Sequence, residues 1–199
     1  MILTETTTIP ASALPLAALK DQLRLGTGFA DDGLQDALVE SHLRAAIAAI
    51  EGRTGKALVE RGFLLRLDDW RFAAAQPLPV APVAAITSVT LRDRLGAATT
   101  ADATRWRLVP DAHRPRLAAT GAALPAVPEG GWIEVAFDAG FGAAWGSVPP
   151  DLSQAVLLLA AEFYERRSEA GLRTAGLPFG VVSLIERWRT VRTFGGGAA

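Results

Sequence analysis

Thr54-Gly55-Lys56 is the segment of this sequence that comes nearest to a phosphate-binding motif. A phosphate loop places a glycine five positions before its Gly-Lys pair and a serine or threonine directly after it. The corresponding residues here are Ile50, which lies inside a helical pattern, and Ala57. We therefore interpret the segment as the end of a helix with glycine just beyond it, and we predict no nucleotide site.

Histidines and paired acids offer no further candidate for catalysis. His42 and His113 are the only histidines and lie far apart in the sequence, so no spacing supports a metal pair or a catalytic triad. Asp31-Asp32 precedes a helical pattern and Asp68-Asp69 follows a strand pattern, where acids usually cap helices or form turns. Cysteine is absent, which excludes thiol chemistry. We predict no catalytic, cofactor-binding or metal-binding residue, and a protein that is not an enzyme.

Four arginines, Arg105, Arg107, Arg114 and Arg116, lie close together in the sequence around Trp106. Arginines with an interleaved aromatic ring can contact a nucleic-acid backbone and stack on a base. A solvated strand face with the tryptophan in the core explains the same pattern, since no other aromatic residue interleaves. We take the four arginines as candidate DNA-proximal residues, and a small DNA-binding module built on them is the alternative to the function inferred below.

Composition narrows the class of protein. Half of the residues are hydrophobic, which predicts a folded globular chain, and the formal net charge of -1 argues against a broad nucleic-acid-binding face. The first eight residues lack the basic and apolar regions of a signal peptide. The longest apolar run, Ala155 to Ala161, is far shorter than the roughly 20 residues needed to cross a bilayer, so we expect no contact with a membrane.

The N-terminal part of the chain has helical periodicity. Residues 1–13 are polar and rich in threonine, and we expect a flexible, extended arm. Residues 14–55 predict two helices, of which the second carries two apolar stripes and therefore has two packing partners. The stripes consist of Leu34, Ala37, Leu38, Ser41, Ala45 and Ala48, and of Leu43, Ile47 and Ile50.

The period changes to that of strands over residues 57–138. Ile133, Val135 and Phe137 alternate with polar or small residues, as expected of a strand with one buried face. This region predicts a small inserted antiparallel β-sheet. A glycine-bearing hinge then leads to a long core helix over residues 148–168, whose apolar stripe continues on nearly all sides.

The C-terminal part, residues 169–199, predicts a glycine-bearing link, a short helix and a tail. The helix has an apolar stripe made by Val181, Leu184, Ile185 and Trp188, and a helix of this length is unstable alone in water. It either folds back on its own subunit or docks on another protein, and we expect the second because the link is permissive. The whole chain, 1–199, is thus predicted as one α+β domain: a small bundle of α-helices, two N-terminal, one long and one short C-terminal, with an inserted small antiparallel β-sheet.

Several of these segments together resemble one family, the head-tail connector or adaptor proteins of long-tailed phages and of phage-derived gene transfer agents. The resemblance rests on the hinge, the starts and ends of the helices and the first leucine-rich helix. The segments are Val135 to Gly142, Val148-Pro149, Leu152 to Ala155, Phe163 to Arg167, Leu19 to Arg24, Asp31-Asp32 and Thr54-Gly55-Lys56. Phe137 and Phe141 depart from the family, in which tyrosine is frequent at these positions.

This resemblance implies a structural subunit without an active site or cofactor. Its partners would be other copies of itself in a ring of about twelve, the portal protein above it, the next connector or stopper protein of the tail below it, and double-stranded DNA passing through the central channel. It would reside in a virion or gene transfer agent particle, and in the host cytoplasm during assembly. The candidate interface with the portal or a neighbour comprises Val181, Leu184, Ile185, Arg187, Trp188, Arg189 and Arg192.

Overall fold

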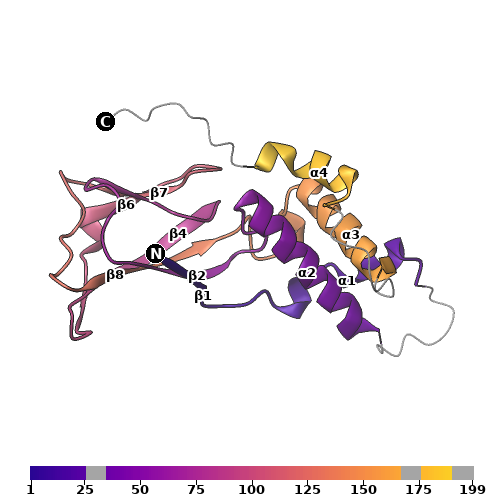
Figure 1. Cartoon of the computed structure of the whole chain (residues 1–199), viewed down its shortest axis with the longest axis horizontal. Helices are drawn as coiled ribbons and strands as arrows, with labels where there is room; N and C mark the ends of the chain where they lie inside the picture. The colour runs from indigo at the N-terminus through magenta and orange to yellow at the C-terminus, as the bar shows by residue number, and fades with distance from the viewer. Residues whose placement is uncertain (26–34, 167–175, 190–199) are drawn as a thin grey trace.

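The computed structural model describes residues 1–25, 35–166 and 176–189. The chain forms an elongated molecule in which the β-strands gather at one end and the helices at the other (Figure 1). Each end has its own hydrophobic core. The fold therefore consists of two packed parts that lie end to end along the long axis.

The larger sheet is antiparallel throughout and has five strands. In spatial order these are β1 (Ile2–Glu5), β2 (Arg61–Leu67), β8 (Trp132–Ala139), β4 (Val83–Arg92) and β5 (Ala98–Thr100). The central strand β8 alternates strictly between buried and half-buried residues, with Ile133, Val135 and Phe137 facing the core. Its period of two places Ile133, Val135 and Phe137 on one face of the sheet.

A second, three-stranded antiparallel sheet covers that face. Its strands, in spatial order, are β3 (Ala75–Pro77), β7 (Arg116–Ala119) and β6 (Trp106–Val109). Leu117 of the middle strand is fully buried in the core between the two sheets. Val89 of β4, in the larger sheet, is fully buried in the same core. The two sheets thus enclose one core between them, as in a β-sandwich.

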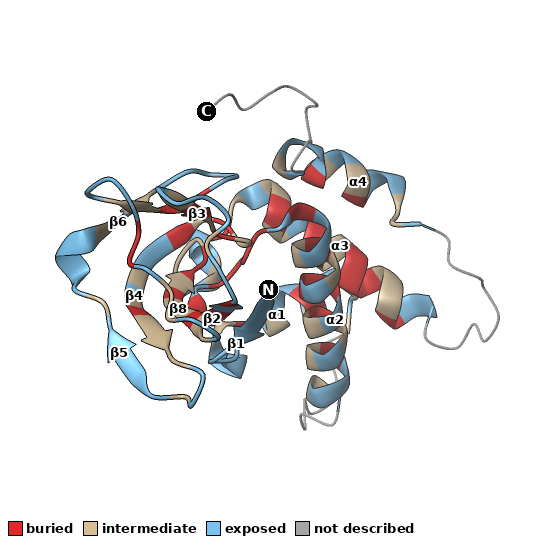
Figure 2. Ribbon diagram, turned by 60° about the vertical axis from the view of Figure 1, so that its left-hand side comes forward, coloured by how far each residue is buried: buried red, intermediate tan, exposed pale blue. Residues whose placement is uncertain are grey.

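The helical part contains four α-helices among the described residues: α1 (Leu16–Gln22), α2 (Asp36–Thr54), α3 (Pro150–Glu165) and α4 (Phe179–Ile185). Figure 2 shows buried residues concentrated where α2, α3 and α4 face one another. Leu43 and Ile50 of α2 pack against Leu152 and Leu159 of α3 in this core. α3 is buried on much of its surface because α1, α2 and α4 all contact it.

The two parts are joined by two short segments that run next to each other. Glu60 donates its N–H to the carbonyl of Gly142 at 2.8 Å, and Phe141 donates to the carbonyl of Leu58 at 3.3 Å. Gly140 has a φ of 146°, and a Cβ at this position would lie 2.3 Å from the Cα of Glu60. The glycine at the end of β8 is therefore required by this close backbone contact.

The predicted fold class, an α+β helical bundle with a small inserted sheet, is wrong. The structure is rich in β-strand: its described residues form eight strands in two sheets, which make a sandwich of their own. Five of these strands, β1, β3, β5, β6 and β7, have only three or four residues, too few to display a burial period. β4 contains two register shifts, which interrupt its alternation of inward and outward residues.

Candidate interaction surfaces

The residues considered for catalysis do not converge. Gly55 ends α2 in the left-handed conformation with φ 67°, so Thr54-Gly55-Lys56 is the predicted helix end. His42 and Asp68-Asp69 lie in different parts of the fold, and Asp31-Asp32 lie outside the described residues. Within the described ranges, no group of three or more histidine and acidic side chains is placed to hold a metal ion.

Lys56 is almost completely buried, which the sequence did not indicate. Its ammonium donates to the carbonyl oxygen of Ala112 at 2.6 Å and lies 3.2 Å from Nδ1 of His113. Burial lowers the pKa of the Lys56 ammonium, and the carboxylate of Asp111 opposes this shift. Lys56 thus fastens the loop between β6 and β7 to the end of α2.

Arg61 forms the second buried charged cluster, at the joint between the two parts. Its guanidinium binds both carboxylate oxygens of Glu5 at 2.8 and 2.9 Å and both of Glu51 at 2.7 and 3.0 Å. Burial opposes the charge on Arg61, but the two carboxylates raise the pKa of the guanidinium above its ordinary value. The segment predicted as a flexible arm therefore contains β1, which pairs with β2 and is bound to Arg61 through Glu5.

The predicted arginine cluster lies on and beside the smaller sheet. Arg105, Arg107, Arg114 and Arg116 are all exposed. Arg107 and Arg116 face outward on the same side, because Arg116 pairs with Val109, two residues along β6 from Arg107. Trp106 points the opposite way and packs against the β core, so its ring is not placed to stack on a base beside these arginines.

The C-terminal helix α4 packs on α3 of the same chain. Val181 and Ile185 are fully buried in the helical core. In the 3₁₀ turn after α4 (Glu186–Trp188), the indole N–H of Trp188 donates to Oδ2 of Asp151 at 2.7 Å, and the ring meets Phe141 edge to face. Arg187 also binds Oδ2 of Asp151, at 2.7 Å.

These contacts correct the expectation that the helix docks on another protein. Its apolar stripe is already used within its own chain, so Val181, Ile185 and Trp188 are not available as anchors for a partner. Leu184 is half-buried, whereas Arg187 and Arg189 are exposed. Arg192 lies outside the described residues.

Phe179, the first residue of α4, is not part of the predicted interface, yet its surface is 86% exposed. Next to α4 a groove of about 750 Å³ is lined by Pro150, Asp151, Ser183, Leu184, Glu186 and Arg187. Exposed aromatic residues beside grooves are common anchors for partners. Helical periodicity could not reveal Phe179, because it lies outside the apolar stripe that defines the helix.

The two stripes of α2 have different environments. Leu43, Ile47 and Ile50 are buried in the helical core. The other stripe, from Ala37 through Leu38 and Ser41 to Ala45 and Ala48, is exposed along the helix. The described part of the chain thus supplies one of the two expected packing partners and leaves the second stripe exposed; Leu34, the first residue of that stripe, lies outside the described residues.

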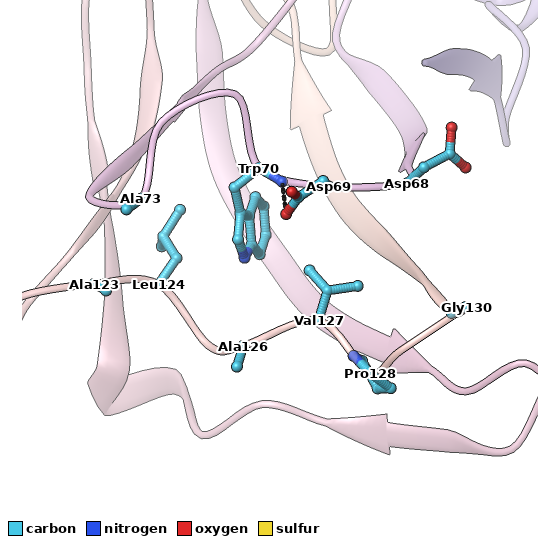
Figure 3. A pocket seen from close by; sticks show the side chains of 11 residues that line it. Asp68, Asp69, Trp70, Ala73, Ala123, Leu124, Ala126, Val127, Pro128 and Gly130 are labelled. Carbon is cyan, nitrogen blue, oxygen red and sulfur yellow. Dashed lines mark hydrogen bonds between the residues drawn. The ribbon is translucent and has the colours of Figure 1, made fainter.

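A second groove lies at the end of the β-sandwich where β2 ends and β8 begins, and Figure 3 shows it from close by. Its volume is about 830 Å³, and Trp70, Leu124 and Val127 supply apolar walls. Asp68 and Asp69 are also among its lining residues. Two hydrogen bonds hold the walls together: from the Trp70 indole N–H to the Pro125 carbonyl, and from the Leu124 N–H to the Ala73 carbonyl, both at 2.8 Å.

Among the described residues, no helix combines the length and hydropathy required to cross a membrane.

No protein-family model and no curated protein matches the chain. Solved structures do match it over nearly its full length. A chain from the neck of an empty gene transfer agent particle, computed with C6 symmetry, is 57% identical, with a TM-score of 0.90 over 98% of this chain and 99% of that chain. A chain from the virion of a native gene transfer agent particle is 57% identical with a TM-score of 0.86, again over 98% and 99%. A chain from the neck of a native particle, computed with C12 symmetry, is 52% identical with a TM-score of 0.85 over the same shares.

Proposed function

Because this chain belongs to the head-tail connector family of phage-derived gene transfer agents, we propose that it is a ring-forming subunit of the particle neck that joins the portal to the tail. One observation carries the proposal: 57% identity over 98% of the chain to a neck component whose fold superposes with a TM-score of 0.90. Its role in the virion neck is structural. We further propose that copies of the chain form a ring, that the ring contacts the portal and that DNA passes through it.

The ring is supported by the symmetry of the matching structures. Chains of this fold occur in necks computed with C6 and with C12 symmetry, and twelve copies satisfy both. Copies in a cyclic ring meet through two different surfaces of the chain. The exposed stripe of α2 from Ala37 to Ala48 offers one such surface, since small side chains allow a neighbouring backbone to approach closely.

The helical end of the molecule is the proposed portal-facing end. Phe179 is exposed at the start of α4, about one helical turn before Ser183, which lines the groove together with Leu184 and Arg187. Exposed aromatic residues and arginines are frequent in binding hot spots. Arg189 is exposed in the turn that follows α4 and extends the same surface. In this proposal Phe179, Leu184, Arg187 and Arg189 form the interface, whereas Val181, Ile185 and Trp188 of the predicted interface pack within their own chain. The opposite, β-rich end then faces the next protein of the tail.

The arginine face of the smaller sheet is the proposed DNA-proximal surface. Arg107 and Arg116 face outward, with Arg105 and Arg114 beside them. Asp102 and Asp111 lie in the same loops and reduce the positive charge. Each neutralised phosphate adds salt-dependent affinity, so a sparse basic face suits DNA that must slide through a channel. A sequence-reading DNA-binding module is less well supported, because Trp106 faces the core.

Particle assembly tests this proposal. Removing the gene is expected to leave filled heads and free tails that do not join, and the wild-type gene is expected to restore joined particles. Phe179→Ala should fail to restore them and should lose binding to the purified portal. The matched control is Phe72→Ala, which removes a second exposed phenylalanine at the β end, away from the proposed portal surface, and should bind the purified portal as the wild type does. Joined particles in the absence of the gene would refute the proposed function.

A further inference from the structure

The proposed function gives no role to Lys56, a lysine just past the end of α2 with 1% of its surface exposed. Burying an ammonium group costs free energy, and an apolar side chain of similar length would fill the same space without that cost. The backbone around Lys56 is fixed by the segment between β3 and β4. The N–H of Ala57 donates to the carbonyl of Ala81 at 2.9 Å, and the N–H of Ala81 donates to the carbonyl of Gly55 at 3.1 Å. The lysine side chain therefore extends from a rigid base toward its partners.

Its partners lie in the loop between β6 and β7. The ammonium of Lys56 donates to the carbonyl oxygen of Ala112 at 2.6 Å and lies 3.2 Å from Nδ1 of His113. Oδ1 of Asp111 closes the same loop by accepting the N–H groups of His113 and Arg114, both at 2.7 Å. These two bonds lower the pKa of Asp111, so its carboxylate stays ionised over the whole range in which histidine titrates. The loop thus has one defined shape, and Lys56 ties that shape to the helical part.

This loop carries part of the proposed DNA-proximal face. Arg114 lies within it, and Arg116 follows directly at the start of β7, where it pairs with Val109 of β6. On the side of the smaller sheet, the N–H of Leu78 donates to the carbonyl of Pro115 at 2.9 Å. The tip of the loop is held from the other side by Lys56. Loss of the lysine contact would therefore free the tip and change how Arg114 is presented.

Protonation of His113 would disrupt that contact. The ring is exposed, so solvent protons reach it, and Nδ1 can accept a bond from the ammonium only while the neutral ring carries its proton on Nε2. A protonated ring loses this acceptor and places a second positive charge 3.2 Å from the ammonium of Lys56. Asp111 attracts both cations and offsets part of their repulsion, whereas Arg114 adds a further positive charge to the loop. The segment 78–82, which packs on the loop, has no titratable side chain.

We propose that Lys56 and His113 form a proton-sensitive latch, in which the neutral ring holds the tip of the loop on the end of α2 and the protonated ring releases it. Lys56 acts in this latch as a positioning residue for Arg114. Opening also adds the charge of the imidazolium to the loop, so both the position and the charge of the arginine face depend on pH. The consequence for a DNA channel rests on the proposed function, whereas the latch is a property of the single chain.

Nitrogen-15 relaxation of the loop amides tests the latch on the isolated full-length chain. In the wild type, the order parameters of the loop tip should fall from about 0.85 near pH 8, typical of rigid backbone, to below about 0.6 near pH 5. Lys56→Met should give the low value at both pH values. His113→Asn is the matched control: its amide oxygen can replace Nδ1 as acceptor but does not titrate, so the loop should stay rigid at both.

The imidazole provides a second, spectroscopic readout. The chain has two histidines, so His113→Asn assigns their signals. Near pH 8 the wild-type ring of His113 should be held in the Nε2–H tautomer, and Lys56→Met should return it to a mixture of both tautomers. A wild-type loop equally rigid at both pH values, or a ring with the same tautomers with and without Lys56, would overturn the latch. Wild type and His113→Asn, which changes an exposed residue, decide the matter even if Lys56→Met does not fold.

Failure of the latch can be told apart from failure of the proposed function. A loop that does not respond to pH in a chain that still forms rings on the portal refutes the latch and leaves the neck subunit intact. A chain that shows the latch but forms no ring on the portal refutes the proposed function alone.

Discussion

Truncation of Ile185 measures how firmly α4 is docked on its own chain. The side chain is 1% exposed and lies in the helical core with Val181 and Leu152. Removing a buried isoleucine to alanine usually costs 2–5 kcal/mol, through lost burial and the cavity left behind, so we expect Ile185→Ala to lower the free energy of unfolding by about 3 kcal/mol. For a chain of this size that corresponds to a melting temperature about 6 to 12 °C lower.

The assay is urea unfolding followed by circular dichroism, with Phe179→Ala as the matched control on the same helix. Phe179 is 86% exposed, so its truncation should change the free energy of unfolding by less than about 0.5 kcal/mol. Equal losses for the two variants would contradict the assigned buried face. An unchanged midpoint for Ile185→Ala would show that α4 does not contribute to the core of its own subunit.

Three further changes probe the joints of the structure. Arg61→Met should cost about 3 to 5 kcal/mol in a urea titration, because it leaves the largely buried carboxylate of Glu51, 13% exposed, without its partner. Gly140→Ala should cost about 1 to 3 kcal/mol by the same measurement, since the position has a φ of 146° and no room for a Cβ. Burial tends to raise the pKa of Asp151, but hydrogen bonds from Trp188 and Arg187 lower it below its ordinary value. The ionised carboxylate of Asp151, bound by Trp188 and Arg187, therefore stabilises the fold above about pH 4, and this contribution is lost as the pH falls further. The difference in unfolding free energy between wild type and Asp151→Asn should accordingly become smaller in acid.

Each of these predictions has a result that would overturn it. Gly121→Ala has open space around its new Cβ and should be silent; an equal loss at Gly121 and Gly140 would remove the steric argument. Arg53→Ala, an exposed arginine near the end of α2, should also be silent, and a loss as large as that of Arg61→Met would mean that burial is not the cause. A gap between wild type and Asp151→Asn that stays constant from pH 7 to pH 3 would show that the carboxylate does not stabilise the fold.

The sequence was informative where an element is long enough to display its own period. β8 alternates over eight residues, and α3 carries its apolar stripe over sixteen, so both could be located from their residues alone. β1 could not, because all four of its residues are exposed and leave no burial pattern. Its position depends on Arg61, a residue far away in the sequence, which explains why a polar arm was expected there.

Interaction surfaces were harder to predict than buried faces, for a physical reason. The stripe of Val181 and Ile185 correctly indicates that α4 buries one face, but amphipathicity does not say against which molecule. Phe179 stands out only once the fold shows that nothing in the described chain covers it. The groove near Asp68 is formed by two loops that are far apart in the sequence, so no local pattern could reveal it.

The central claim is that many copies of this chain form a ring in the neck between portal and tail. Electron cryomicroscopy of the chain assembled with its portal tests it most directly, with the reconstruction computed without imposed symmetry. We predict about twelve equivalent densities below the portal, each fitted by this fold with α4 on its own subunit and the arginine face of β6 and β7 toward the channel. A reconstruction in which the chain is absent from the neck, or present as a single copy, would contradict the account.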